Sequence, residues 1–204
     1  MSSIAEIAQR LRHQAGPVSR YMVGIAGPPA AGKSTLSEQL REELTKQGES
    51  AIVVAMDGFH YDDAILNARG QRGRKGAPHT YDVAGFEVLL KRIKARELDI
   101  AIPVFDRSLE LSRAGADIVS DETKFILVEG NYLLLNSAPW NRLEPLFNFT
   151  LYIDVPEAEL VRRLMQRWHE HGFDEIYAKN WIASNDLPNI RVIQEGSAKA
   201  DLVI

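Results

Sequence analysis

The chain has 204 residues, of which 45% are hydrophobic, and its formal net charge is −4. A chain of this length can bury a full hydrophobic core as one domain, and its acidic balance argues against a surface that coats nucleic acid. The absence of cysteine excludes disulfides, a thiol nucleophile and cysteine metal ligands. Residues 1–6 lack the features of a signal peptide and no apolar run is long enough to span a membrane. We therefore expect a cytoplasmic protein with neither a membrane nor a nucleic-acid partner.

The first predicted element is an amphipathic helix. Ser3 followed by Glu6 is typical of a capping box, and apolar residues then recur at helical spacing. We expect this helix, within residues 1–18, to pack on the rest of the domain.

A strand-type apolar run at 22–26 leads into a segment with the spacing G-x-x-x-x-G-K-[ST]. Its residues are Gly27, Pro28, Pro29, Ala30, Ala31, Gly32, Lys33, Ser34 and Thr35. In such a loop the backbone N–H groups point at phosphate oxygens, the lysine reaches the β- and γ-phosphates, and the serine hydroxyl ligates Mg²⁺. A leucine stripe at 36, 40 and 44 predicts a helix directly afterwards, whose N-terminus favours phosphate. This context argues against a chance match, and we expect ATP and Mg²⁺ as ligands.

Further apolar runs of strand type lie at 51–56, 125–128, 149–153 and 201–204. Helical patterns lie between them at 86–93, where Asp82 is a candidate cap, and at 156–170. Continuous apolar strands separated by amphipathic helices predict an α/β fold, a three-layer doubly wound parallel sheet of the P-loop nucleoside triphosphate hydrolase type. No linker or repeat divides the sequence, so we expect a single domain over residues 1–204.

Two acidic residues stand at predicted strand ends, where ligands bind in parallel sheets. Asp57 follows the run at 51–56 and Glu129 follows the run at 125–128, and each precedes a glycine. A lone acid in this position usually caps a helix, but two of them beside a phosphate loop favour chemistry. Phosphoryl transfer to an alcohol needs a group that accepts the hydroxyl proton and groups that hold Mg²⁺. We predict Asp57 as this base, Glu129 and Ser34 as metal ligands, and Lys33 as a catalytic cation.

A cationic, glycine-rich segment at 67–76 follows the first of these acids. A solvated loop and a nucleic-acid-binding loop are the alternatives, but we favour a loop that covers a substrate, with Arg74 and Lys75 as candidate contacts. For His60, substrate contact and ordinary polar surface are equally good interpretations.

Arginines occupy the polar face of the predicted helix at 156–170. Arg163 and Arg167 are four residues apart and share one face, which most often means a solvated surface. Either could also fold over ATP and stabilise charge on the transferred phosphoryl group, and we take both as catalytic candidates. The three tryptophans, at 140, 168 and 181, are expected to pack in or near the core.

Several motifs occur in one order along the chain: the loop Gly27–Thr35, Asp57-Gly58-Phe59-His60, the run from Arg74 to Asp82, Pro103-Val104-Phe105-Asp106 and Val128-Glu129-Gly130. Together they resemble the phosphoribulokinase/uridine kinase/bacterial pantothenate kinase family of P-loop kinases, and most of all its small bacterial members described as sugar kinases associated with fructose transport. The resemblance implies a base at Asp57, a metal-side glutamate at Glu129, and acceptor contacts at Tyr81, Asp82, Asp106 and Arg107. The segment Asn185–Asn189 also resembles these kinases, without an assigned role.

The leading hypothesis is an ATP- and Mg²⁺-dependent kinase that phosphorylates a hydroxyl group of a small metabolite, with a sugar such as fructose as one candidate. Uridine and pantothenate are alternative acceptors. A regulatory P-loop NTPase without an acceptor is the alternative of another class, although the chain lacks an Asn/Thr-Lys-x-Asp guanine-reading motif. A homodimer is an open alternative to a monomer.

Overall fold

The structure, a computed structural model, describes residues 3–204. Within them, the central sheet has five strands in the order β2-β5-β1-β6-β7, and every neighbouring pair is parallel. The strands are β1 (Tyr21–Ala26), β2 (Ala51–Ala55), β5 (Phe125–Gly130), β6 (Phe149–Tyr152) and β7 (Leu202–Val203). Every residue of β1 and β5 is buried, because helices cover both faces. The predicted α/β fold is confirmed.

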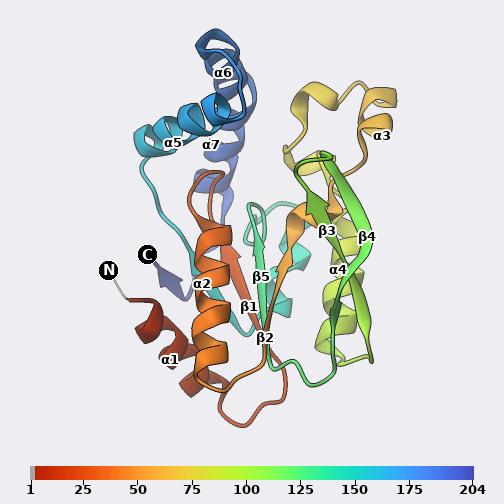
Figure 1. The fold of residues 1–204 in the computed structure, drawn as a ribbon, viewed down its shortest axis with the longest axis vertical. Coiled ribbons are helices and arrows are strands. Elements are labelled where there is room, and N and C mark those ends of the chain that lie inside the picture. The colour runs from red at the N-terminus through yellow and green to blue at the C-terminus, as the bar shows by residue number, and fades with distance from the viewer. Residues whose placement is uncertain (1–2) are drawn as a thin grey trace.

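Helices form the two outer layers (Figure 1). Their bounds are α1 (Ile4–Ala15), α2 (Lys33–Lys46), α3 (Asp63–Ala68), α4 (Val83–Lys94), α5 (Glu157–Glu170), α6 (Glu175–Trp181) and α7 (Leu187–Gly196). Side chains of α1, α2 and α5 pack on one face of the sheet and those of α4 on the other. Successive side chains of β1 point to opposite faces of the sheet and so enter both cores: Met22 belongs to the core on the α4 side and Val23 to the core on the α2 side.

The predicted helix starts are confirmed. Ser3 and Glu6 form a capping box at α1, where each side chain bonds the other residue's backbone N–H. The Asp82 carboxylate accepts a hydrogen bond from the Gly85 N–H and so caps α4.

An antiparallel hairpin was not predicted. Its strands are β3 (Ile100–Asp106) and β4 (Leu111–Val119), paired outside the central sheet. Most of β4 is exposed and its register shifts opposite Ile102 and Val104, so the sequence carries no clear apolar alternation there. The hairpin packs against the turn that follows β2. A Cβ on Gly58 would lie 2.6 Å from the Pro103 carbonyl oxygen, so glycine permits this contact.

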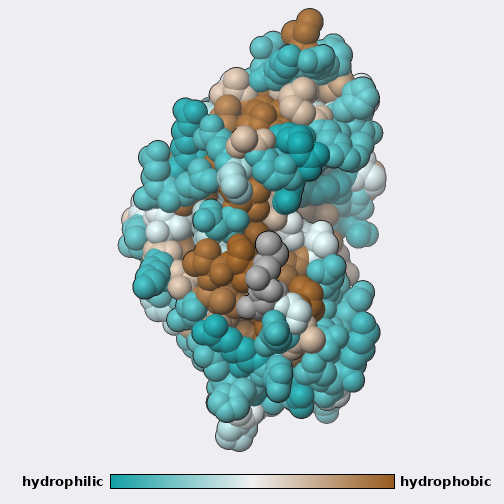
Figure 2. Space-filling view, turned by 90° about the vertical axis from the view of Figure 1, so that its left-hand side faces the viewer, coloured by the Kyte–Doolittle hydropathy of each residue, from teal (hydrophilic) through white to brown (hydrophobic). Residues whose placement is uncertain are grey.

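No helix within residues 3–204 has the length and apolar content needed to cross a membrane. The face in Figure 2 is mostly hydrophilic around a central hydrophobic area.

We predict that Gly58→Ala lowers the free energy of unfolding by about 1–3 kcal/mol, because the added methyl group must push the hairpin away from the turn. Urea denaturation measures this. Gly73→Ala is the matched control, because a Cβ there meets no atom within 4 Å and the backbone is not left-handed. Equal stability of the two variants would contradict the close approach of hairpin and turn.

Candidate active site

The site lies where three neighbouring parallel strands end. The phosphate-loop segment follows β1, Asp57 lies in the 3-10 turn Met56–Phe59 after β2, and Glu129 is near the end of β5. The register pairs Ala55 with Glu129 and Ala26 with Gly130, which places these ends side by side. They line one cleft of about 570 Å³. Figure 1 shows α5, α6 and α7 gathered above one side of this end of the sheet and α3 above the opposite side.

The phosphate-loop segment has the backbone geometry that its glycines allow. Gly27 has φ +152°, and a Cβ there would lie 2.9 Å from the Ile153 carbonyl oxygen. Gly32, at φ +100°, is the N-cap residue of α2. The buried Lys33 Nζ donates a hydrogen bond to the Pro28 carbonyl oxygen at 2.8 Å. Burial lowers the Lys33 pKa to about 8, although Glu129 and Asp57 oppose the shift.

Ser34, in the first turn of α2, contacts Glu129 of β5. The Ser34 Oγ donates to Glu129 Oε1 at 3.2 Å. Burial raises the Glu129 pKa, and the nearby Lys33 opposes this. These hard oxygen donors fit Mg²⁺, which takes one or two protein oxygens together with phosphate oxygens. No group of three or more His, Cys, Asp or Glu that could hold a metal occurs within residues 3–204.

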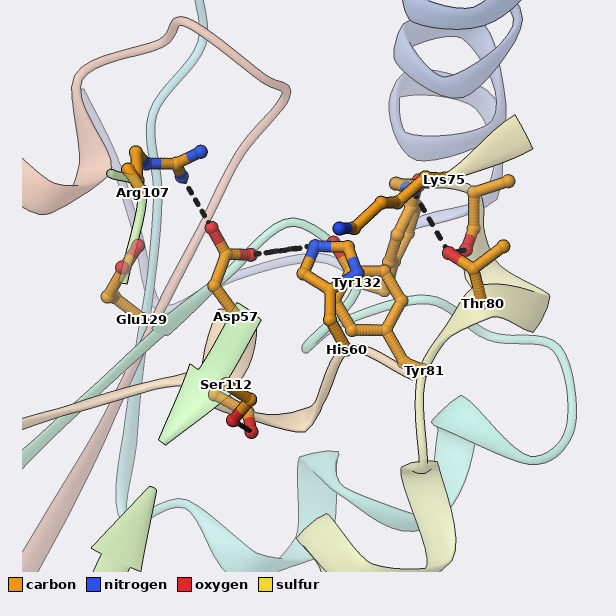
Figure 3. A network of polar contacts seen from close by, with 12 residues as sticks. Asp57, His60, Lys75, Thr80, Tyr81, Arg107, Ser112, Glu129 and Tyr132 are labelled. Carbon is orange, nitrogen blue, oxygen red and sulfur yellow. Dashed lines mark hydrogen bonds and ion pairs between the residues drawn. The ribbon is translucent and has the colours of Figure 1, made fainter. Parts of the chain in front are cut away.

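Asp57 is surrounded by three polar side chains (Figure 3). Arg107 Nη2 donates to its Oδ2 at 2.7 Å, and the Tyr81 hydroxyl donates to its Oδ1 at 3.4 Å. His60 Nε2 lies 3.8 Å from the same Oδ1. The His60 ring stacks on Tyr81 with centroids 4.0 Å apart, and burial lowers the His60 pKa to about 4. His60 is therefore neutral near pH 7, and the cation beside Asp57 is Arg107.

Four of the predicted substrate residues line the cleft: His60, Lys75, Tyr81 and Arg107. The structure places the other three elsewhere. Arg74 donates to the Ser184 carbonyl oxygen and to Asn189 Oδ1, and Asp82 caps α4. Asp106 accepts hydrogen bonds from the backbone at 108 and 109, which closes the hairpin turn.

The two candidate arginines of α5 have different surroundings. Arg167 lines the cleft, and burial and the nearby Arg107 both lower its pKa. Arg163 is not part of the cleft lining. It donates to the carbonyl oxygens of Ala30 and Ala31 at 3.2 and 3.3 Å and to Glu159 at 2.7 Å. Arg163 thus links α5 to the phosphate-loop segment outside the cleft.

The wall built by α5, α6 and the segment after them was not predicted from the sequence. Trp168 and Trp181 were expected in or near the core; Trp168 packs against the α2-side core, and both also line the cleft. Phe173, which precedes α6, and Tyr177 continue this wall, and the i, i+4 spacing of Tyr177 and Trp181 on one face of α6 was a usable signal. In the segment without an assigned role, the Asn185 amide donates to the Lys75 carbonyl oxygen at 2.9 Å.

Asp186 is the titratable group of this wall. Its Oδ2 accepts a hydrogen bond from Trp168 Nε1 at 3.3 Å. Burial raises the Asp186 pKa to about 6, although this bond and Arg167 oppose the shift.

Comparisons with known proteins find that the chain is similar to several kinases and, over its first part, to a GTPase family. A crystal structure of a proposed fructose transport system kinase from Silicibacter sp. TM1040 is 38% identical, covers all of both chains and superposes with a TM-score of 0.95. A proposed uridine kinase of Schizosaccharomyces pombe is 31% identical over the whole chain and 91% of its own length. The pantothenate kinase of Photorhabdus laumondii is 29% identical over 82% of the chain, which spans 57% of that enzyme. The family model described as methylmalonyl Co-A mutase-associated GTPase MeaB matches residues 2–62.

We predict that tryptophan fluorescence changes with a midpoint near pH 6, because ionisation of Asp186 alters the environment of the Trp168 indole. The measurement is an emission titration from pH 4.5 to 8. Asp186→Asn should abolish the transition, and Trp168→Phe should remove its amplitude while Trp140 and Trp181 still emit. A transition that survives in Asp186→Asn would contradict the assignment.

Proposed function

Because the chain belongs to the phosphoribulokinase/uridine kinase/pantothenate kinase family of P-loop kinases, we propose that it transfers the γ-phosphate of ATP to a hydroxyl group of a small metabolite. The observation that carries this proposal is the position of Asp57. It lies at the end of the strand next to β5 and in the same cleft as the phosphate-loop segment. A carboxylate there can accept the proton of a hydroxyl that attacks a phosphate bound at the loop.

In the proposed reaction, the hydroxyl oxygen of the acceptor forms a bond to the γ-phosphorus. The bond between that phosphorus and the oxygen that bridges it to the β-phosphate breaks, ADP leaves with the electron pair, and the hydroxyl proton passes to Asp57. Lys33 and Arg167 contribute positive charge from within the cleft toward the transferred group. Mg²⁺, which P-loop kinases use in general, would be held by Ser34 and Glu129 and would neutralise phosphate charge.

The acceptor is a small hydroxylated metabolite, and it enters on the side of Asp57, His60 and Tyr81. The names of the related proteins supply fructose, uridine and pantothenate as candidates. All three carry a hydroxyl group that can be phosphorylated, so the base in this chain suits each of them.

A GTPase-like regulatory activity is the second candidate, because the MeaB family model matches residues 2–62. These residues include the phosphate-loop segment and Asp57 but end before the hairpin and α5. The chain has no Asn/Thr-Lys-x-Asp sequence for reading guanine. The kinase proposal accounts for the acceptor side of the cleft, which a switch does not need.

We predict that one or more hydroxylated metabolites stimulate ADP release and that Asp57→Asn lowers this turnover by about 10²- to 10⁴-fold. ATP binding should be nearly unchanged, because Asp57 serves the acceptor. Coupled ADP release and calorimetric ATP titration measure the two effects, with the exposed Asp117→Asn as the matched control. Slow hydrolysis that no acceptor stimulates would overturn the kinase proposal in favour of the regulatory one, and unchanged turnover in Asp57→Asn would overturn the base assignment.

We predict that ATP binding takes up a proton at pH 8.5. The pKa of Lys33 is lowered to about 8 before ATP binds, and phosphate charge raises it again. Affinity should therefore fall above pH 8, by up to about tenfold per pH unit. Calorimetry in two buffers of different ionisation enthalpy measures the uptake. Lys33→Met should abolish it, whereas Lys46→Met, at the exposed end of the same helix, should not. Equal uptake in both variants would exclude Lys33 as the source.

A further inference from the structure

Arg107 is the most available cation on the acceptor side of the cleft. It follows β3 at the hairpin turn, lines the cleft and keeps 57% of its side chain exposed. Among residues 3–204, its guanidinium donates a single hydrogen bond, to Asp57 Oδ2 at 2.7 Å. A guanidinium has five donor hydrogens in a planar fork. Most of the hydrogen-bonding capacity of Arg107 is therefore free to meet a ligand beside the proposed base.

The other cations of this side are committed to protein partners. Lys75 is almost fully buried and bonds Asp63 Oδ1 at 2.8 Å and the Glu110 carbonyl oxygen at 3.0 Å. Arg72 Nε bonds Asp63 Oδ2 at 2.6 Å. These contacts tie α3, the cationic loop and the hairpin turn together, and of these three cations Arg107 is the one that bonds Asp57.

Arg167 lies on the side of the cleft next to the phosphate-loop segment, where the phosphate donor ATP would bind. It lies on α5, one helical turn after Arg163, and Arg163 holds the carbonyl oxygens of the phosphate-loop segment. Arg107 comes from the hairpin, which packs on the turn that carries Asp57. The two arginines therefore enter the cleft from different elements, and although Arg107 lies close enough to Arg167 to lower its pKa, Arg107 is the one that bonds Asp57.

We propose that the acceptor is a small hydroxy acid whose carboxylate binds Arg107 while its hydroxyl group faces Asp57. This inference rests on the proposed kinase function and specifies its substrate class. The 2.7 Å contact between Arg107 and Asp57 means that groups bound to each of them lie within a few ångströms. A carboxylate and a hydroxyl one or two carbons apart have this separation. The acid group is recognised, and the hydroxyl oxygen attacks the γ-phosphorus.

The exchange of partners favours an acid over a neutral alcohol. An acceptor carboxylate can replace the Asp57 carboxylate on Arg107 with two parallel hydrogen bonds, and it leaves Asp57 free to accept the hydroxyl proton. A neutral polyol offers Arg107 only weaker acceptors and must compete with the existing ion pair. On the other side of Asp57 lies the neutral His60, and the nearby Lys75 is already paired with Asp63 and Glu110.

The test uses acceptor pairs that differ only in a carboxylate against a hydroxymethyl group and whose acid carries a hydroxyl one or two carbons from the carboxylate: glycerate with glycerol, and gluconate with glucitol. ADP release gives kcat and KM for each member with the full-length protein and saturating MgATP. The variants are Arg107→Gln, the charge-preserving Arg107→Lys, and Arg113→Gln as the matched control. Arg113 lies on the same hairpin, is 55% exposed and pairs with Asp106, outside the cleft.

We expect at least one acid to be preferred over its neutral partner by about tenfold or more in kcat/KM. Arg107→Gln should remove this preference by raising KM for the acid about 10- to 100-fold, while kcat/KM for the neutral partner changes little. Arg107→Lys should restore part of the preference, and Arg113→Gln should match the unmodified protein.

Two outcomes would overturn the inference and leave the kinase function in place. One is a neutral partner used as well as its acid. The other is an equal loss of kcat for acid and neutral acceptors in Arg107→Gln, which would place Arg107 on the transferred phosphoryl group instead. If no acid and no neutral partner stimulates ADP release while ATP binds, the kinase proposal falls, and this inference falls with it.

Discussion

The parallel pairing of β2, β5 and β1 is the constraint on which the site depends. Parallel strands expose their carboxyl ends at one edge, and the register sets Ala55 opposite Glu129 and Ala26 opposite Gly130. Three segments far apart in the sequence therefore bring Lys33, Asp57 and Glu129 to one cleft. The cores on both faces hold the strands in this order, so the chemistry depends on hydrophobic packing away from the cleft.

Burial gives the charges of this cleft their properties. It lowers the pKa values of Lys33 and Arg167 and raises that of Glu129, so each group gains from a partner of opposite charge. Protein atoms supply such partners: Lys33 bonds a loop carbonyl oxygen, Ser34 bonds Glu129, and Arg107 bonds Asp57. Each is a contact that a phosphate, a cation or an acceptor can replace with a stronger one. For the groups that are already buried, binding in this cleft is therefore an exchange of partners.

The parts of the site that the central sheet positions can be predicted from the sequence, because strands buried on both faces are continuous apolar runs. The phosphate-loop segment, Asp57 and Glu129 follow from where those runs end. The exposed β4 has no such signature, so the hairpin was missed, and Arg107 was anticipated only from the family resemblance. Arg163 and Arg167 share a polar helical face. Only tertiary contacts show that Arg163 bonds the phosphate-loop segment whereas Arg167 lines the cleft. Asp106 is a cap whose partners cannot be read from residue type.

The hairpin, which was not predicted, and the loop around Lys75, which was, form the wall of the cleft beside Asp57. Loops placed at the ends of a sheet often carry the binding residues of a fold. Lys75 links this loop to α3 and to the hairpin, since it bonds both Asp63 of α3 and Glu110 of the hairpin turn. Asn185 extends the link by bonding the Lys75 backbone from the segment before α7. The wall beside Asp57 and the chain from Ser184 into α7 are thus joined at two points, by Lys75 and by Arg74, which bonds the Ser184 carbonyl oxygen and Asn189 Oδ1.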